Sequence, residues 1–283
     1  DDDEDTSTGG APAEELTIGG FNFSESSILV SIYEGALAAE GIEVTVRPNL
    51  GSREIVAPAL ERGEIDLYPG YAATDLEFYN QGAGEASPDV EATVEKLRSR
   101  LVPKNITALQ PSPAVNANAF AVTKATAERY NLETLSDLAP VAGELRLGGP
   151  PECPARPFCA AGLEATYGIR FKEFKPLDVG GPLSKTALER GDVDVALIFS
   201  SDGAIPDKGF VVLEDDKKLQ NADNVVPIIR TGVVTEKVRQ VLNRVSAALT
   251  TEDLVELNKR ADVDKEDPET LAKEWLEEHG FAK

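Results

Sequence analysis

One nine-residue pattern occurs twice in this chain, at 59–67 and at 187–195, and each copy begins Ala-Leu-Glu-Arg-Gly. Each copy predicts the end of an amphipathic helix, a turn at the glycine, and a buried strand that begins close to an aspartate. An aromatic residue follows at the same position in both copies, Tyr71 in the first and Phe199 in the second. A chain that builds one helix–strand unit twice can present two aromatic rings to one cleft from opposite sides. The pattern therefore predicts two lobes with a ligand site between them.

The length of the chain fits this interpretation, because 283 residues are long for one core and sufficient for two lobes. No apolar run approaches the ~20 residues that a membrane-spanning helix needs. Methionine is absent, even at position 1. We therefore expect a processed form from which a targeting segment has been removed.

The net charge of −22 argues against a nucleic-acid partner, since the phosphates would be repelled. Part of that charge lies in residues 1–14, where an acidic run is followed by Thr, Ser, Gly and Pro without apolar periodicity. Such a segment cannot pack, so we expect a disordered acidic tether there. Two interpretations stay open: a plain solvated tail, or a spacer that holds the mature protein off a surface.

The two cysteines, Cys153 and Cys159, flank a proline-rich loop. A zinc site is disfavoured, because the spacing is too wide and the single histidine, His279, is far away in the sequence. We expect no metal and no cofactor. Free buried thiols are one alternative, but a proline-rich loop is a poor place to bury them. A disulfide is favoured, and it implies an oxidising, extracytoplasmic compartment.

Predicted strands and helices alternate in the first part of the chain, which indicates parallel pairing and an α/β lobe. We expect strands over 16–19, 42–46 and 64–68, and helices over 25–39, from 51–53 onward, and over 89–101. Ser24 is the predicted N-cap of the first helix.

The second lobe is expected to begin with a strand over 116–123. Its other predicted strands cover 145–147, 170–174, 193–199 and 210–213, and its helices cover 125–130, 159–167 and 184–190. A strand over 224–229 returns the chain to the first lobe, before helices over 235–248, 251–260 and 268–278. Lobe 1 would thus comprise 15–116 plus 224–283, lobe 2 would comprise 117–223, and two crossings near Asn116 and Asp223 would form a hinge.

Several segments, in order, match a family of transport proteins: 22–25, 49–56, 65–71, 120–124, 148–152, 172–175, 200–203, 213–217, 249–252 and 257–258. From about Leu16 to the C-terminus, the chain resembles the substrate-binding proteins of ABC importers for glycine betaine, choline, carnitine and similar osmoprotectants. The resemblance implies a type II-like periplasmic-binding-protein fold, with two hinged α/β lobes and a ligand cleft between them.

The same resemblance implies an extracytoplasmic solute-binding protein. It would capture a quaternary-ammonium or related solute by lobe closure and deliver it to an ABC permease and its ATPase. We expect a monomer, either periplasmic or a cell-surface lipoprotein, with a lipid anchor as its only membrane attachment. An enzyme or a ligand sensor on the same fold is the rival interpretation. Catalysis is disfavoured, because no nucleophile–base pair and no glycine-rich phosphate loop is evident.

The family typically surrounds the trimethylammonium group with four tyrosines, which attract it through cation–π contacts. By alignment these positions fall on Tyr71, Asn118, Phe199 and Asp223, so only two of them are aromatic here.

Two further positions depart from the family. Phe21 replaces a lysine and could supply a new aromatic wall, and Asn116 replaces an acidic hinge residue. Asp223 could neutralise a cation or accept hydrogen bonds. A larger ligand, such as an aromatic betaine or a polyphenol, is therefore an alternative to glycine betaine.

Arg156 lies at the family position of an arginine that grips the ligand carboxylate, a role that suits a guanidinium. The cysteines bracket it, so the disulfide would preorganise its loop. Ser24 and Thr74 lie where helix N-termini would face the cleft and could donate to an anion. The alternatives are a surface arginine, plain helix caps and, for Tyr71 and Phe199, ordinary core packing.

Overall fold

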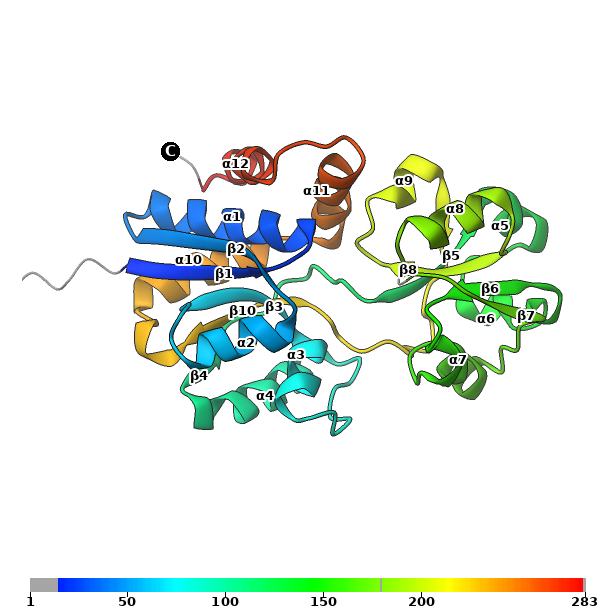
Figure 1. Cartoon of the computed structure of the whole chain (residues 1–283), viewed down its shortest axis with the longest axis horizontal. Coiled ribbons are helices and arrows are strands. Elements are labelled where there is room, and N and C mark those ends of the chain that lie inside the picture. The colour runs from blue at the N-terminus through cyan, green and yellow to red at the C-terminus, as the bar shows by residue number, and fades with distance from the viewer. Residues whose placement is uncertain (1–14, 179, 282–283) are drawn as a thin grey trace, which may run out of the picture.

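The computed structural model describes residues 15–178 and 180–281, so the predicted acidic tether lies outside the described residues. Two five-stranded sheets, each with helices packed around it, are joined by two connecting segments (Figure 1). We call the sheet that contains β1 and its helices lobe 1, and the other sheet with its helices lobe 2. The arrangement confirms the predicted mixed α/β class with two lobes.

Lobe 1 has the strand order β2-β1-β3-β10-β4, in which β1 is parallel to β2 and β3, and β10 is antiparallel to both of its neighbours. Its elements from the first part of the chain are β1 (Glu15–Phe21), α1 (Ser24–Ala39), β2 (Glu43–Gly51), α2 (Arg53–Glu61), β3 (Leu67–Tyr71), α3 (Ala72–Tyr79), α4 (Val90–Leu101), η1 (Val102–Lys104) and β4 (Ile106–Ala108). Its elements from the last part are β10 (Val225–Arg230), η4 (Thr231–Val233), α10 (Glu236–Ala248), α11 (Thr251–Asp262) and α12 (Pro268–Glu278).

Lobe 2 repeats this plan with the order β7-β6-β8-β5-β9, in which β6 is parallel to β7 and β8, and β5 is antiparallel to both of its neighbours. Its elements are β5 (Asn118–Thr123), α5 (Lys124–Tyr130), α6 (Leu135–Leu138), η2 (Ala142–Glu144), β6 (Arg146–Gly149), η3 (Cys153–Ala155), α7 (Ala160–Tyr167), β7 (Glu173–Pro176), α8 (Pro182–Arg190), β8 (Val195–Phe199), α9 (Ala204–Lys208) and β9 (Phe210–Val212).

The sequence repeat builds the same joint in both lobes. Helices α2 and α8 are each followed by a glycine with φ of +72°, Gly63 and Gly191, a conformation that other residues rarely adopt. The aspartate before each following strand accepts a hydrogen bond from a backbone N–H at the neighbouring parallel strand: Asp66 from Thr17 at 2.9 Å, and Asp194 from Arg146 at 2.8 Å. The repeat therefore fixes where β3 and β8 begin.

The structure corrects several predicted boundaries. The strand expected over 64–68 begins only at Leu67 and continues through Pro69 to Tyr71. Proline is tolerated there because it faces Pro227 of β10, and neither residue has an N–H to donate. The strand expected over 170–174 lies at Glu173–Pro176, and helix α3 and strand β4 were not predicted. Ser24 is the first residue of α1 and not its N-cap; Phe23 occupies the cap position without a side-chain hydrogen bond.

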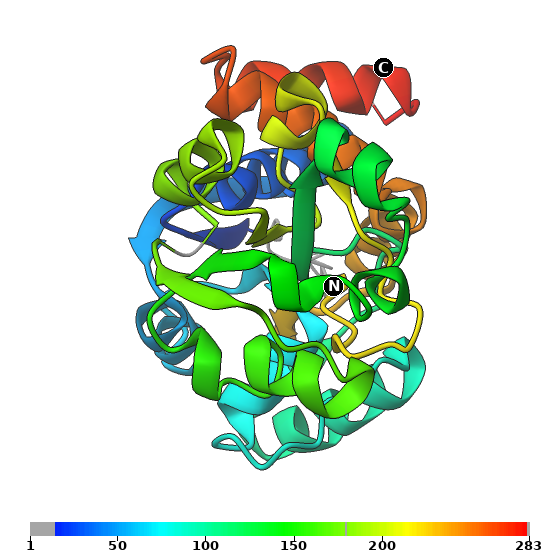
Figure 2. The same cartoon turned by 90° about the vertical axis from the view of Figure 1, so that its right-hand side faces the viewer.

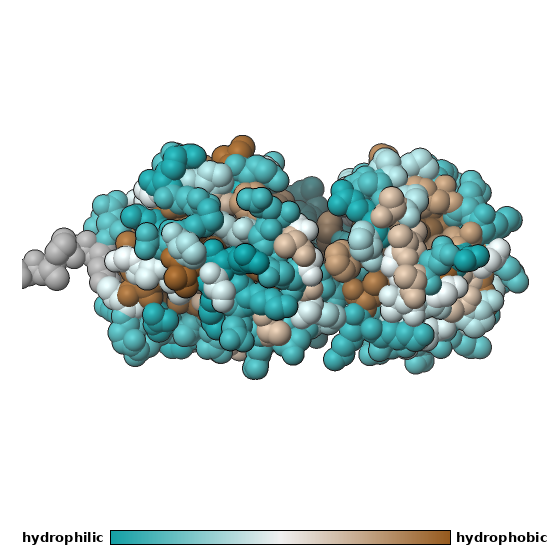
Figure 3. All heavy atoms as spheres, turned by 90° about the horizontal axis from the view of Figure 1, so that it is seen from below, coloured by the Kyte–Doolittle hydropathy of each residue, from teal (hydrophilic) through white to brown (hydrophobic). Residues whose placement is uncertain are grey.

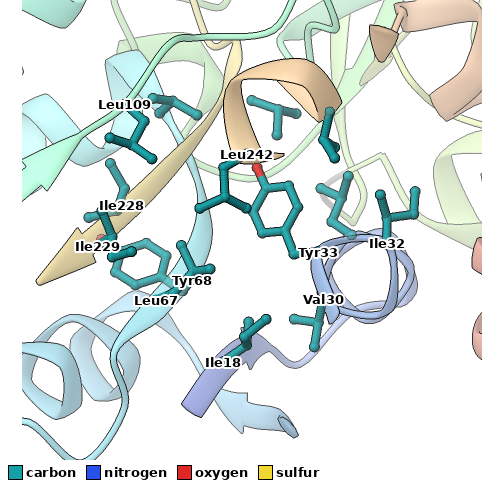
Figure 4. Close-up of a cluster of buried hydrophobic side chains, with 14 of the residues drawn as sticks. Ile18, Val30, Ile32, Tyr33, Leu67, Tyr68, Leu109, Ile228, Ile229 and Leu242 are labelled. Carbon is teal, nitrogen blue, oxygen red and sulfur yellow. The ribbon is translucent and has the colours of Figure 1, made fainter. Parts of the chain in front are cut away.

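The core of lobe 1 packs both ends of the chain against each other. Strand β10 lies beside β3, so that Ile228 and Ile229 contact the same buried cluster as Tyr68 and Leu67, with Leu242 from α10 above them (Figure 4). Complete burial of aliphatic side chains of this size stabilises a fold by about 1.5–3 kcal/mol each. The lobe thus depends on residues after 225 for its stability.

Two segments connect the lobes, and a third contact supports them. The connecting segments pair at Val115 and Asn224 in an isolated antiparallel bridge. Away from the connecting segments, the loop after β8 contacts α11. There, the Nδ2 of Asn258 donates to the carbonyl of Ser201 at 2.8 Å. Gly203 approaches α11 so closely that a Cβ would lie 2.0 Å from the backbone nitrogen of Lys259. The end-on view places α11 and α12 along one edge of the molecule (Figure 2).

Among the described helices, none combines the length and the hydropathy needed to cross a bilayer.

Candidate functional site

A cavity of about 770 Å³ lies between the two lobes and is lined by residues of both. The space-filling view shows the molecule hollowed between them (Figure 3). Lobe 2 contributes Gly180, Gly181, Lys185, Phe199, Ser201 and Asp202. Lobe 1 and the connecting segments contribute the remaining wall.

Three aromatic rings of lobe 1 form a continuous wall. Phe21 ends β1, Phe23 precedes α1, and Tyr71 ends β3. The ring centroids of Phe21 and Phe23 are 5.7 Å apart, and those of Phe23 and Tyr71 are 6.2 Å apart. Phe23 is 41% exposed, whereas Phe21 and Tyr71 are buried. Phe199, half-buried at the end of β8, lines the same cavity from lobe 2. Faces of this kind attract organic cations.

An ion pair supports the aromatic wall from behind. Arg53 Nε lies 2.7 Å from Asp75 Oδ1, and the guanidinium carbon lies 4.8 Å from the centroid of Phe21. Asp75 is completely buried and also accepts hydrogen bonds from the Tyr68 hydroxyl and the Tyr71 backbone N–H. Burial lowers the pKa of Arg53, but Asp75, Tyr68 and Asp223 together raise it by more, so the arginine stays charged. The positive charge of Arg53 is therefore already balanced by Asp75.

The second connecting segment contributes a carboxylate. Asp223 accepts hydrogen bonds from the backbone N–H and the hydroxyl of Thr74, at 2.8 and 2.5 Å. Desolvation raises the pKa of Asp223, although the bonds from Thr74 oppose the shift. Thr74 thus orients a carboxylate at the cavity wall.

Glu25 joins three parts of lobe 1 beneath the wall. It is 5% exposed and accepts hydrogen bonds from the Tyr71 hydroxyl at 2.5 Å, from Asn116 at 2.9 Å and from Asn258 at 2.6 Å. Burial, followed by the nearby Glu25 carboxylate, raises the pKa of Tyr71 well above its usual value. Tyr71 is therefore a neutral phenol whose ring is held in one orientation.

The cavity lining is acidic overall. Its carboxylates are Glu25, Glu54, Asp202, Asp223 and Asp262, and its cationic side chains are Arg53 and Lys185. Arg53 is bound to Asp75, and Lys185 Nζ lies 2.7 Å from Asp202. Negative charge that is not neutralised therefore remains next to the aromatic rings, and this combination favours a positively charged guest.

Most of the predicted ligand residues come together in this cavity. It is lined by Phe21, Ser24, Tyr71, Thr74, Asn116, Phe199 and Asp223. Their roles in binding stay predictions. Tyr71 belongs to the core of lobe 1 as well as to the cavity wall, so both interpretations of this residue apply.

Two predicted residues lie elsewhere. Asn118 pairs with Phe199 across β5 and β8 but lines a separate cavity of about 310 Å³. Arg156 is exposed and lies outside the cavity between the lobes. The disulfide explains the position of Arg156: the two cysteines are buried, with Cα atoms 5.1 Å apart, so the residues between them project from the surface. The predicted bond between Cys153 and Cys159 is confirmed.

The sequence interpretation missed several lining residues. Phe23 and Glu25 lie in the segment 22–25, Asp202 in 200–203 and Asn258 in 257–258, which had all been singled out as family-like. The segments were a signal, but the sequence does not show which side chains point inward. Nothing in the sequence indicated Lys185. Within 15–178 and 180–281, no group of three or more His, Cys, Asp or Glu side chains could hold a metal ion.

Comparison with known proteins gives concordant matches. A family model described as the substrate-binding domain of an ABC-type glycine betaine transport system matches residues 14–278. A glycine-betaine-binding protein of Pseudomonas aeruginosa is 29% identical over 282 residues, covering 95% of this chain and 89% of that protein. A carnitine transport binding protein of Listeria monocytogenes is 28% identical, covering 96% and 89%. A crystal structure of a glycine betaine/carnitine/choline ABC transporter superposes with a TM-score of 0.86 at 28% identity, covering 94% of this chain and 99% of that one.

Proposed function

Because the chain belongs to the family of substrate-binding domains of ABC-type glycine betaine transport systems, we propose that its cavity binds a quaternary-ammonium solute. The observation that carries the proposal is one cavity in which four aromatic rings lie beside an acidic lining. A trimethylammonium group is weakly hydrated and donates no hydrogen bond, so aromatic faces and negative charge are its natural partners. Each such face contributes about 0.5–2 kcal/mol.

Binding would close the lobes. Phe21, Phe23 and Tyr71 belong to lobe 1 and Phe199 to lobe 2, so a guest that contacts both walls favours the conformation in which they approach each other. The two connecting segments, which pair at Val115 and Asn224, are the natural hinge. We assign lobe 1 to 15–116 plus 224–283 and lobe 2 to 117–223.

The partners and the location follow from this role. We propose that the protein acts as a monomer outside the cytoplasm, either periplasmic or lipid-anchored, and delivers its solute to an ABC permease and its ATPase. The disulfide supports an oxidising compartment.

A larger aromatic or hydroxylated guest is the second candidate. The cavity volume of about 770 Å³ lies in the range of sites for drug-sized ligands. Asp223, held by Thr74, could accept hydrogen bonds from hydroxyl groups of such a guest. An aromatic betaine would satisfy both the rings and the carboxylate.

Titration calorimetry of the purified protein tests the proposal, with choline, glycine betaine, carnitine, ergothioneine and a simple polyphenol as probes. We expect saturable binding of at least one ammonium compound. Phe199→Leu should weaken it, whereas Phe158→Leu, a change to an exposed ring outside the cavity, should not. Absence of binding to every ammonium compound, or equal effects of the two substitutions, would contradict the proposal.

A further inference from the structure

Glu25 differs from the other ionic groups of the cavity because it is deeply buried without a cationic partner. The residue is 5% exposed, and its hydrogen-bond donors are a phenol and two amides, from Tyr71, Asn116 and Asn258. Within the described part of the chain, no Lys, Arg or His forms an ion pair with it. The buried Asp75, by contrast, is bound to Arg53 at 2.7 Å.

The donors of Glu25 show that its oxygens act as acceptors. Both asparagines donate through Nδ2, and the phenol donates its proton to the same oxygen as Asn116. Three such bonds compensate part of the desolvation penalty of a buried carboxylate. Among the described residues no cationic side chain is paired with this carboxylate, and the group lines the cavity.

Tyr71 contacts both the Glu25 carboxylate and the cavity in which the guest would bind. Its hydroxyl bonds to the carboxylate while its ring is part of the aromatic wall, 6.2 Å from Phe23 and 6.5 Å from Phe21. A phenol that donates to an anion carries more electron density on its ring, because hydrogen-bonded groups polarise one another. A ring of greater electron density attracts a cation more strongly. The asparagines hold the carboxylate in place, so the polarised ring is fixed in position.

We propose that Glu25 is a specificity-determining residue, which makes this cavity select a cation over a neutral molecule of the same shape by acting through the ring of Tyr71. The inference rests on the proposed function and adds a named source for the charge preference. Glu25 is coupled to an aromatic ring, whereas Glu43, an exposed carboxylate of β2, lies outside the cavity.

Two probes isolate the charge. Choline and 3,3-dimethyl-1-butanol have the same shape, but a carbon replaces the nitrogen in the second, so the ratio of their affinities measures the preference for a cation. We expect the wild-type protein to prefer choline and Glu25→Gln to lower this ratio about tenfold. Tyr71→Phe keeps the ring and removes the hydroxyl, and should lower the ratio about threefold. Glu43→Gln, the matched control outside the cavity, should leave it within about twofold.

A purely structural role for Glu25 predicts a different result. A change in the shape of the cavity alone would weaken the binding of both probes equally. An unchanged ratio of affinities in Glu25→Gln therefore overturns the inference. The proposed function still stands in that case, provided that the wild-type protein binds choline. Wild-type protein that binds neither probe would instead overturn the proposed function. If Glu25→Gln does not fold, Tyr71→Phe decides: a lowered ratio supports the inference, and an unchanged ratio overturns it.

Discussion

The two lobes share one plan but end their matching strands differently. In both, a strand that begins after an aspartate, β3 or β8, carries an aromatic residue at its end. Tyr71 is 5% exposed, belongs to the core of lobe 1 and is bonded through its hydroxyl. Phe199 has no hydroxyl, is half-buried and lies close to Gly180. The repeat thus determines where an aromatic ring is placed, and the surroundings determine how firmly it is held.

The two walls therefore differ in how firmly each holds its ring. In the lobe 1 wall, Tyr71 is held by packing and by its hydrogen bond to Glu25. In the lobe 2 wall, Phe199 is half-buried and has no hydroxyl to hold it by a hydrogen bond.

The largest expected effect compares the two aromatic residues in the absence of ligand. Tyr71→Ala removes a buried ring and should lower the free energy of unfolding by about 3–5 kcal/mol. Phe199→Ala removes a half-buried ring and should lower it by about 1 kcal/mol. Urea unfolding followed by circular dichroism measures both. Equal losses would show that the two rings are packed equally tightly.

The next effect concerns the disulfide, which lies in lobe 2. Replacing Cys153 and Cys159 with serine removes a short cross-link, and the free energy of unfolding should fall by about 2 kcal/mol. Thermal unfolding with and without reductant provides the measurement. The double variant should be insensitive to reductant; a wild-type protein equally insensitive to it would contradict the expectation.

A smaller effect should appear in acid. Burial raises the pKa of Asp194, but the hydrogen bonds and charge of Arg146, with the charge of Lys172, together lower it by more, so the folded pKa is below the ordinary value. The stabilisation is present above the unfolded pKa of about 4 and is lost as the pH falls through the folded pKa. Asp194→Asn should therefore reduce the loss of stability below about pH 4. Asp192→Asn, a change to an exposed neighbouring residue, should not alter the loss of stability in acid. Identical stability profiles of the two variants in acid would refute the role of Asp194.

The smallest effect concerns the segment between the lobes. The pKa of Asp223 is raised by desolvation, and Arg53 and Asp75 are the charged groups that face it. A bound cation favours the ionised form and lowers this pKa, so choline affinity should decline as the pH falls through it. Calorimetry across pH should show a shallower decline in Asp223→Asn. A steeper decline in the variant would exclude Asp223 as a partner of the cation.

The sequence predicted the fold better than it predicted the site. The repeat located Tyr71 and Phe199, because helix, glycine turn and strand are local features with clear patterns. The contacts of Glu25 were not predictable, since Asn116 and Asn258 are 91 and 233 residues away from it. Arg156 was placed by family position alone, and only the structure shows that the disulfide directs its loop outward.

The strand order of lobe 1 has a consequence for how the chain folds during synthesis. Strand β10 lies between β3 and β4, so the central position between these two strands stays unfilled until residues near 225 have been synthesised. Every strand of lobe 2 precedes that point and is contiguous in sequence. The lobe that emerges first is therefore completed last. Until then, β3 and β4 present unpaired edges that other chains could join.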